Sequence, residues 1–169
     1  KYLLHTNEHV HAMKMFSIQQ SKQANPIIDW LDACVIFDPN VKTYVGSAKP
    51  APKDADRRYA YSHHRLYASF REFCDDNGGK GMGRGRFEEA LDDIFSNQLK
   101  LNIYRGKGRI VYYNNVTLRD RPDSNGMVDE SKQHHYPSIV ELACSPDNYK
   151  DFYAGYPITK QQQDNQELL

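Results

Sequence analysis

The spacing of apolar residues changes once, near residue 97, and this change limits the folds open to the chain. Over residues 83–96 the apolar residues recur every three or four positions, which is typical of a helix with one buried side. Over residues 99–103 they alternate with polar residues, which is typical of a strand. A helix followed directly by a strand predicts a chain of the α+β class.

The elements on both sides of this change predict a winged helix-turn-helix, in which three helices are followed by a β-hairpin wing. Asn25 and Pro26 are typical of a helix start, and Asn77-Gly78 is typical of a helix end. A turn signal at residues 38–40 precedes the first strand. In chain order we predict helix, strand, helix, helix, strand, basic turn and strand, over residues 26–35, 41–45, 62–77, 83–96, 99–103, 105–109 and 110–118.

The two ends of the chain are expected to lie outside this domain, which we place at residues 25–121. Residues 1–24 are polar and weakly periodic, and they predict a poorly ordered N-terminal arm. Residues 122–169 carry 3 basic and 8 acidic side chains, and they predict an acidic C-terminal extension that is partly disordered, above all at KQQQDNQELL. Within this extension, residues 135–144 fit a short helix or a strand, and the aromatic residues of 149–156 are candidates to fold back on the core.

The stretch NGGKGMGRGRFEEALDDI, residues 77–94, is either a loop for nucleotide phosphates or a turn between two helices. A phosphate loop requires GxxxxGK followed by Ser or Thr, or else GxGxxG, and in both cases a preceding strand. Neither pattern occurs, and a predicted helix precedes the glycines. We therefore interpret the stretch as a turn, and we expect no ATP hydrolysis and no enzyme activity in this chain.

Basic residues concentrate in the middle of the chain, where residues 57–121 hold 13 basic and 8 acidic side chains. A helix N-terminus attracts anions through its dipole and its free amides, and a basic turn adds phosphate contacts. The candidate DNA contacts lie at the start of the 83–96 helix and at the basic turn: Lys80, Arg84, Arg86, Arg105, Lys107 and Arg109. Four carboxylates occupy the exposed side of this helix, so we expect contact at its N-terminal end and not along its length. The alternative is a solvated turn that binds nothing.

Tyrosines, histidines and cysteines are the other candidates for stacking, metal binding and catalysis. Five tyrosines near the basic segment either stack on unpaired bases or belong to the core and its rim: Tyr59, Tyr61, Tyr104, Tyr112 and Tyr113. His5, His9 and His11 would share one face of a helix with Glu8 nearby, but no cysteine or carboxylate pattern completes a metal site. The three cysteines show no CxxC spacing, and no nucleophile motif is present. We therefore predict no metal, no cofactor and no catalytic residue.

Four segments follow one another in a characteristic order: NPIIDWLDACVIFDP (25–39), SHHRLYASFREFCDDNG (62–78), GRGRFEEALDDIF (83–95) and LNIYRGKGRIVYY (101–113). In this order they resemble the C-terminal region of the poxvirus-type primase–helicases carried by phages, plasmids and large DNA viruses, which are superfamily 3 replication proteins. The LY-x-x-F-x-x-FC pattern over residues 66–74 is the most telling part of the resemblance, which covers residues 25–118.

The resemblance implies a DNA-binding accessory domain of a replication protein of a virus, phage, plasmid or other mobile element. By position it adds His64 and Arg65, at the start of the middle helix, to the candidate DNA contacts. Duplex or single-stranded DNA and a helicase motor are the implied partners. The chain departs from the family because it lacks the motor and carries about fifty residues after the hairpin.

The alternative function is a protein-interaction or oligomerisation module of a replication complex. Such a module would dock through Trp30, the acidic helix side and the aromatic residues of the tail. No apolar run approaches the roughly 18 residues of a membrane helix, and no signal peptide is visible, so we expect a cytoplasmic location and no membrane partner. The chain does not begin with Met, so we expect a fragment of a longer protein.

Overall fold

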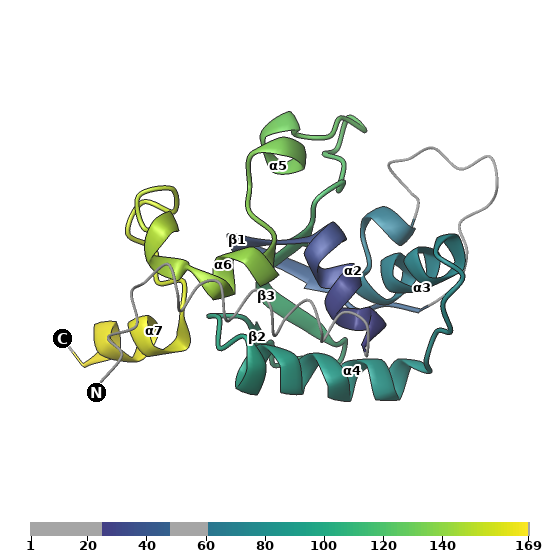
Figure 1. The fold of residues 1–169 in the computed structure, drawn as a ribbon, viewed down its shortest axis with the longest axis horizontal. Coiled ribbons are helices and arrows are strands. Elements are labelled where there is room, and N and C mark those ends of the chain that lie inside the picture. Colours follow the sequence, from purple (N-terminus) through teal and green to yellow (C-terminus); the bar gives the residue numbers. More distant parts are fainter. Residues whose placement is uncertain (1–24, 48–60, 169) are drawn as a thin grey trace, which may run out of the picture.

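The computed structural model describes residues 25–47 and 61–168, which form an α+β structure (Figure 1). Its elements follow the chain in this order: α2 (Pro26–Cys34), β1 (Val35–Tyr44), η2 (Tyr61–His63), α3 (Leu66–Asp76), α4 (Arg84–Asp93), η3 (Ile94–Gln98), β2 (Tyr104–Arg105), β3 (Tyr112–Leu118), α5 (Glu130–His134), α6 (Ile139–Cys144), η4 (Pro146–Tyr149) and α7 (Lys160–Glu167). The predicted N-terminal arm and Tyr59 lie outside the described residues. The predicted α+β class is confirmed.

The strands form one three-stranded antiparallel sheet in the order β1-β3-β2, so the last strand in the chain lies between the other two. β3 pairs with β1 over most of its length, whereas β2 contributes only two residues to the ladder. α4 and η3 run along one side of the sheet, and α5 lies on the other side (Figure 1). The sheet therefore has one face toward α4 and one face away from it.

The three helices predicted within residues 25–121 are present, with shifts at their ends. The Asn25 side chain accepts a hydrogen bond from the Ile27 amide at 3.0 Å, and Pro26 opens α2, as expected of a helix start. α3 begins at Leu66 and not at Ser62, because residues 61–63 form a separate 3-10 turn. α4 continues into the π-helical turn η3.

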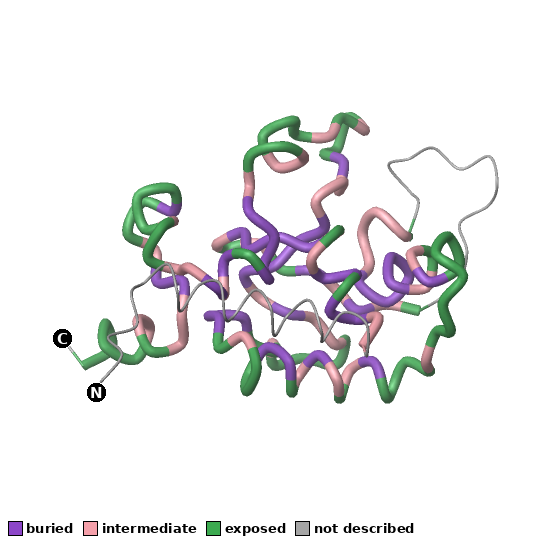
Figure 2. Tube along the Cα trace, viewed as in Figure 1, coloured by how far each residue is buried: buried purple, intermediate pink, exposed green. Residues whose placement is uncertain are grey.

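An aromatic cluster holds these three helices together. The Trp30 ring of α2 lies 5.7 Å from the Phe70 ring of α3 and 5.5 Å from the Phe87 ring of α4, measured between centroids, and Phe70 and Phe87 stack at 4.9 Å. All three side chains are fully buried, and Trp30 Nε1 donates a hydrogen bond to Ser69 Oγ at 3.0 Å. Figure 2 shows the buried segments gathered where the helices meet the sheet. The apolar stripes of the predicted helices thus form one core.

The turn predicted at residues 38–40 is a bulge inside β1. The strand pairs with β3 on both sides of it, and the register shifts between Phe37 and Lys42. Asn40 adopts a φ of 69°, and its amide donates to Oδ1 of Asn115, whose own φ is 68°. Proline has no amide to donate to a ladder, so Pro39 is tolerated at such a bulge. The strand predicted at 41–45 is present, but it starts at Val35.

The strand predicted at 99–103 is wrong. Leu101 and Ile103 are buried, as their alternation with polar residues suggests, but the β2–β3 ladder contains only Tyr104 and Arg105. Leu101 instead forms an isolated bridge with Thr159, the Asn102 amide donates to the Ile158 carbonyl, and the Lys160 amide donates to the Lys100 carbonyl. Backbone from beyond residue 121 therefore takes the hydrogen bonds that the hairpin was expected to use.

Residues after 121 pack on the same core as the residues before it, which differs from the separate extension that we expected. Five of them belong to the main hydrophobic cluster: Ile139, Val140, Leu142, Tyr153 and Ile158. Tyr153 folds back as predicted, and its hydroxyl donates to the Phe37 carbonyl at 2.9 Å. The segment 135–144, which fitted either a helix or a strand, contains the helix α6.

The disorder predicted for KQQQDNQELL is wrong over residues 160–167, which form α7. Thr159 and Gln162 form a capping box at its start, in which each side chain bonds the backbone of the other residue. The sequence contains this Thr-x-x-Gln signature, so composition alone misled the prediction. Among the described helices, none is long and apolar enough to cross a membrane.

Candidate nucleic-acid interface

The start of α4 presents basic side chains beside free backbone amides. The helix begins after Gly83 without a side-chain cap, so its first amides have no side-chain acceptor at the cap position. Lys80, Arg84 and Arg86 are all exposed there. The loop that leads to them is anchored, because the Tyr67 hydroxyl donates to the Met82 carbonyl at 2.8 Å. This end of α4 can therefore attract an anion through its dipole and its side chains together.

The turn between β2 and β3, here called the tip, spans residues 106–111 and is longer than the predicted turn at 105–109. The Gly106 amide donates to the Tyr112 carbonyl at 2.9 Å and closes the turn. A Cβ on Gly106 would lie 2.0 Å from the Tyr112 ring, so a larger residue there requires this ring to move. Lys107 and Arg109 are exposed on the tip, and Ile110 beside them is 59% exposed.

A chain of hydrogen bonds links the base of the tip to the start of α4. The Val45 amide donates to the Val111 carbonyl at 3.0 Å, and the Tyr67 amide donates to the Val45 carbonyl at 3.0 Å. The Tyr67 hydroxyl then reaches Met82, one residue before the cap of α4. The two basic groups that the sequence placed together are therefore connected through one end of the sheet.

Arg105 is exposed like the cations of the tip, but it forms ion pairs. Its guanidinium pairs with Glu88 at 3.0 Å and with Asp92 at 3.3 Å, both on α4. Glu88 also forms an ion pair with Arg84 at 3.0 Å, and the Tyr113 hydroxyl donates a hydrogen bond to Asp92. These two carboxylates, expected on the exposed side of the helix, instead join α4 to the sheet. We call Glu88, Asp92, Arg105 and Tyr113 the clamp.

The clamp also changes the titration of its tyrosine. Burial raises the pKa of Tyr113 above its ordinary value of 10, and the hydrogen bond to Asp92 raises it further. The phenol is only 1% exposed and stays protonated as the donor of that bond. Tyr113 is therefore a core residue and is excluded from the tyrosines available to stack on bases.

The remaining predicted contacts differ in how they are held. Within the described residues, no ion pair involves Lys80, Arg86, Lys107 or Arg109, so these four cations are available to phosphates. His64 lies half-buried in the turn before α3, where its amide donates to the Tyr61 carbonyl at 3.0 Å. Arg65 lies 5.3 Å above the Tyr44 ring and 5.9 Å from the Tyr61 ring. Arg65 thus belongs with the tyrosines and not with the start of α4.

Two residues near Arg65 were missed at the sequence level. Lys42 lies over the Tyr44 ring at 5.5 Å, and Arg121 donates to the Lys42 carbonyl at 3.2 Å. The alternation of VKTYV at 41–45 puts Lys42 and Tyr44 on one face of a strand, which was the available signal. Nothing local in the sequence places Arg121 beside them, because 78 residues separate it from Thr43.

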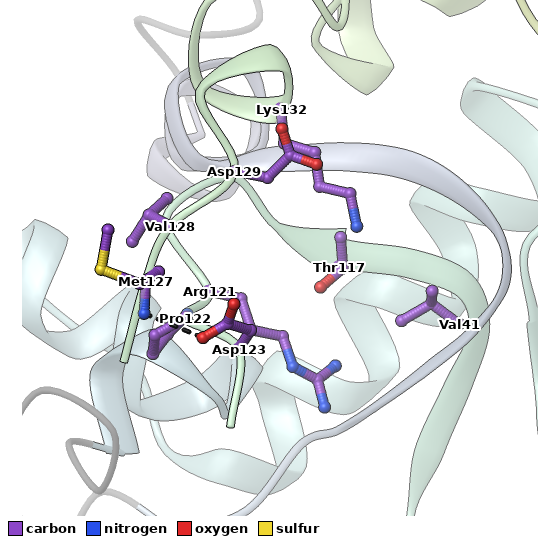
Figure 3. Close-up of a pocket in the computed structure, with 9 residues that line it drawn as sticks. All are labelled: Val41, Thr117, Arg121, Pro122, Asp123, Met127, Val128, Asp129 and Lys132. Atoms are coloured by element: carbon purple, nitrogen blue, oxygen red, sulfur yellow. Dashed lines mark hydrogen bonds between the residues drawn. The ribbon is translucent and has the colours of Figure 1, made fainter. Parts of the chain in front are cut away.

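A hollow of about 560 Å³ lies beside Arg121, between the sheet and the segment that leads to α5 (Figure 3). Its charged lining is mixed, since Arg121 and Lys132 face Asp123 and Asp129. Lys132 is already paired with Asp38 at 2.7 Å. The described residues contain no group of three or more His, Cys, Asp or Glu side chains arranged to hold a metal ion. The hollow therefore defines no site for a particular small ligand.

Comparison of the chain with protein families, with curated protein sequences and with solved structures finds no match.

Proposed function

We propose that this chain is a winged-helix domain that binds DNA without catalysing a reaction, and that it serves as an accessory domain of a replication protein of the primase–helicase type. The support for the fold is the chain order of its elements. α2, β1, α3, α4, β2 and β3 follow one another as helix, strand, helix, helix, strand, strand, and the sheet order is β1-β3-β2. In this arrangement α4 is the recognition helix and the tip belongs to the wing.

One observation carries the DNA-binding proposal. The uncapped start of α4 and the tip are joined through Val45 and Tyr67, and together they present four cations without ion-pair partners in the described structure: Lys80, Arg86, Lys107 and Arg109. Each such cation neutralises one phosphate and releases one counterion. Contacts of this kind position a duplex and do not read its sequence.

The clamp limits how α4 contacts DNA. Glu88 and Asp92 are directed to Arg105 and Tyr113, which reduces the repulsion that free carboxylates would exert on phosphates. Glu89 and Asp93 still lie exposed along the helix. The helix therefore meets the duplex with its N-terminal end, and Arg105 positions the wing without contacting phosphate.

The alternative function, a protein-interaction module, requires Trp30 to be accessible to a partner. Trp30 is fully buried between α3 and α4, and Tyr153 is in the core. Neither side chain is available to a partner unless the core opens.

The proposal is tested by fluorescence anisotropy of a labelled duplex at about 50 and 200 mM salt. In the test variant Arg86, Lys107 and Arg109 are changed to Gln together. In the matched control Lys100, Lys150 and Lys160 are changed to Gln, which removes the same charge at the other end of α4 and beyond. We expect the slope of log affinity against log salt to fall by about 2.7 in the test variant, because each phosphate contact contributes about 0.9. Equal affinities for both variants would contradict the proposed interface.

A further inference from the structure

The face of the sheet that points away from α4 carries a row of tyrosines. Side chains alternate along each strand, and cross-strand partners share a face. Arg105 and Tyr113 are partners and both reach α4, so their neighbours point the other way. The neighbours are Tyr104, Tyr112 and, as the partner of Tyr112 on β1, Tyr44. All three strands therefore contribute a tyrosine to this open face.

These tyrosines are accessible to different degrees. Tyr104 is 53% exposed, and Tyr61 at the edge of the row is 39% exposed. Tyr44 and Tyr112 are half-buried, with their rings 5.7 Å apart in an edge arrangement. Large rings left in water on a folded sheet lose the burial that normally accounts for their presence. A row of them on one face is suited to flat, aromatic partners.

Cations are interleaved with the rings. The Lys42 amine lies 5.1 Å from the Tyr112 ring centre and Arg65 lies over Tyr44. Arg121, at the edge of the same region, donates to the Lys42 carbonyl. Burial lowers the pKa of Arg121, the Arg65 charge lowers it further, and the Asp38 carboxylate opposes this shift. Within the described residues none of these three cations has an ion-pair partner.

The nearest carboxylates around this face are already engaged or set apart. Asp120 pairs with His63 at 2.5 Å, and Asp38 pairs with Lys132 at 2.7 Å. Asp123 and Asp129 line the hollow beyond Arg121. At the other end, Arg65 and Tyr61 line a smaller hollow of about 210 Å³ with Gly46 and Ser47. Lys42 and Arg65 thus form no ion pair within the described structure, which favours an anionic occupant.

We propose that this open face binds single-stranded DNA. Bases stack on Tyr104 and lie beside the Tyr44–Tyr112 pair, while Lys42 and Arg65, which lie over the rings of that pair, contact the phosphates. Alternating rings and cations match the alternation of bases and phosphates along a strand, and unpaired bases stack on aromatic side chains with little sequence preference. Duplex DNA is a poor fit, because its bases are already stacked on one another. The surface is separate from α4 and the tip; only the choice of DNA as the polynucleotide rests on the proposed function.

The test measures binding of a labelled oligo(dT) strand by fluorescence anisotropy, with the same duplex as a second ligand. Tyr104→Ala is expected to weaken oligo(dT) binding at least about 5-fold, as for a lost base stack, whereas Tyr104→Phe keeps the ring and the affinity. Phe152→Ala, a 43% exposed ring outside the sheet, is the matched control and is expected to bind as the wild type does. Duplex binding is expected to be unchanged in all three.

Charge is tested separately with Lys42→Gln and Arg65→Gln combined. We expect the salt slope for oligo(dT) to fall by about 1.4, because each phosphate contact on a single strand contributes about 0.7. Lys150→Gln, which removes an exposed lysine directly after η4, is expected to leave the slope unchanged.

Three results would overturn the proposal. Unchanged oligo(dT) binding by Tyr104→Ala and by the charge variant excludes the open face. Loss of oligo(dT) binding in the α4 and tip variant alone assigns both ligands to that interface. Tighter, tyrosine-dependent binding of oligo(rU) assigns the face to RNA and not to DNA. Failure of the duplex test with retained tyrosine-dependent oligo(dT) binding would remove the proposed function of α4 and leave this surface standing.

Discussion

The two faces of the sheet use the same residue types in different ways. On the α4 side, Arg105 and Tyr113 meet Glu88 and Asp92 and form the clamp. On the open side, Arg65 and Lys42 lie over tyrosine rings, and no carboxylate pairs with them among the described residues. Arginine and tyrosine thus bind carboxylates on one face and form a cation–π contact with each other on the opposite face. The two faces differ because α4 places the carboxylates of Glu88 and Asp92 against only one of them.

This difference explains why the acidic residues of α4 were expected to be exposed to solvent. Four acidic residues on one side of a helix predict a solvated surface that repels phosphates. Two of them, Glu88 and Asp92, instead form ion pairs and a hydrogen bond with side chains of the sheet. The helix is attached to the sheet by these acids as well as by Phe87 and Leu91, which are fully buried. Polar contacts in the clamp therefore fix the orientation of α4, and the apolar contacts supply most of its stability.

The largest effect is expected from removing the buried ring of the clamp. Tyr113→Ala leaves a cavity beside Phe95, whose ring lies 5.2 Å away, and leaves Asp92 without its hydroxyl donor. We expect a loss of about 3–5 kcal/mol of unfolding free energy, as for other large aromatic-to-alanine changes in a core. Urea denaturation measures this loss. Tyr104→Ala on the open face is the matched comparison and is expected to change stability by less than about 0.5 kcal/mol. Similar losses for the two variants would remove the distinction between the faces.

A smaller effect is expected from removing only the hydroxyl. Tyr113→Phe keeps the ring in place and deletes the bond to Asp92, which we expect to cost about 1–2 kcal/mol near neutral pH. The sign of the pH dependence follows from the raised pKa of Tyr113. Its contribution to stability is fully present below pH 10 and declines as the pH rises above 10, because the unfolded chain ionises first.

The measurement is unfolding free energy between about pH 9 and 11 for both proteins. We expect the wild type to lose stability with a steeper slope than Tyr113→Phe. Part of the slope remains in the variant, because burial also raises the pKa of Tyr153. Identical slopes would show that Tyr113 is not the buried donor described here.

Much of the fold was predictable because its helices follow local rules. Asn25 and Pro26 set the start of α2, and two apolar stripes, with Leu66 and Phe70 on α3 and Phe87 on α4, mark the sides that meet in the core. The errors come from long-range contacts. Thr159 pairs with Leu101 across 58 positions of the chain, and no local pattern in residues 99–103 reveals that partner. The bulge at Asn40 depends likewise on Asn115.

The candidate sites were predictable to a similar extent. The sequence identified Arg86, Lys107 and Arg109 as basic residues at helix and turn ends, and the structure leaves all three exposed. The sequence did not distinguish these residues from Arg105. Arg105 lies in the short strand β2, and its side chain is on the face of the sheet that contacts α4. The pattern of tyrosines was visible too, but only the sheet register divides Tyr113 from its neighbours.

A further test of the clamp concerns its ion pairs. Arg105→Gln removes the partner of Glu88 and Asp92 in a partly exposed site, so we expect a stability loss of about 0.5–1 kcal/mol and not the larger loss of a buried pair. The loss is expected to shrink at high salt, since exposed ion pairs are screened. Arg84→Gln, which removes the other arginine on Glu88, serves as the comparison and is expected to cost less, because Arg84 has one carboxylate partner. Urea denaturation at about 50 and 500 mM salt measures both variants.

The smallest effect on stability is expected at the tip. Lys107→Gln and Arg109→Gln change exposed residues that form no ion pair within the described structure, so each is expected to alter the unfolding free energy by less than about 0.5 kcal/mol. Under the proposed function, the same changes weaken duplex binding, whereas Arg105→Gln lowers stability more than it lowers affinity. Plotting the two effects for each arginine and lysine separates residues that hold the fold from residues that face a ligand. If Arg105→Gln and Arg109→Gln change the unfolding free energy and the duplex affinity by the same amounts, Arg105 does not differ in role from the residues of the tip.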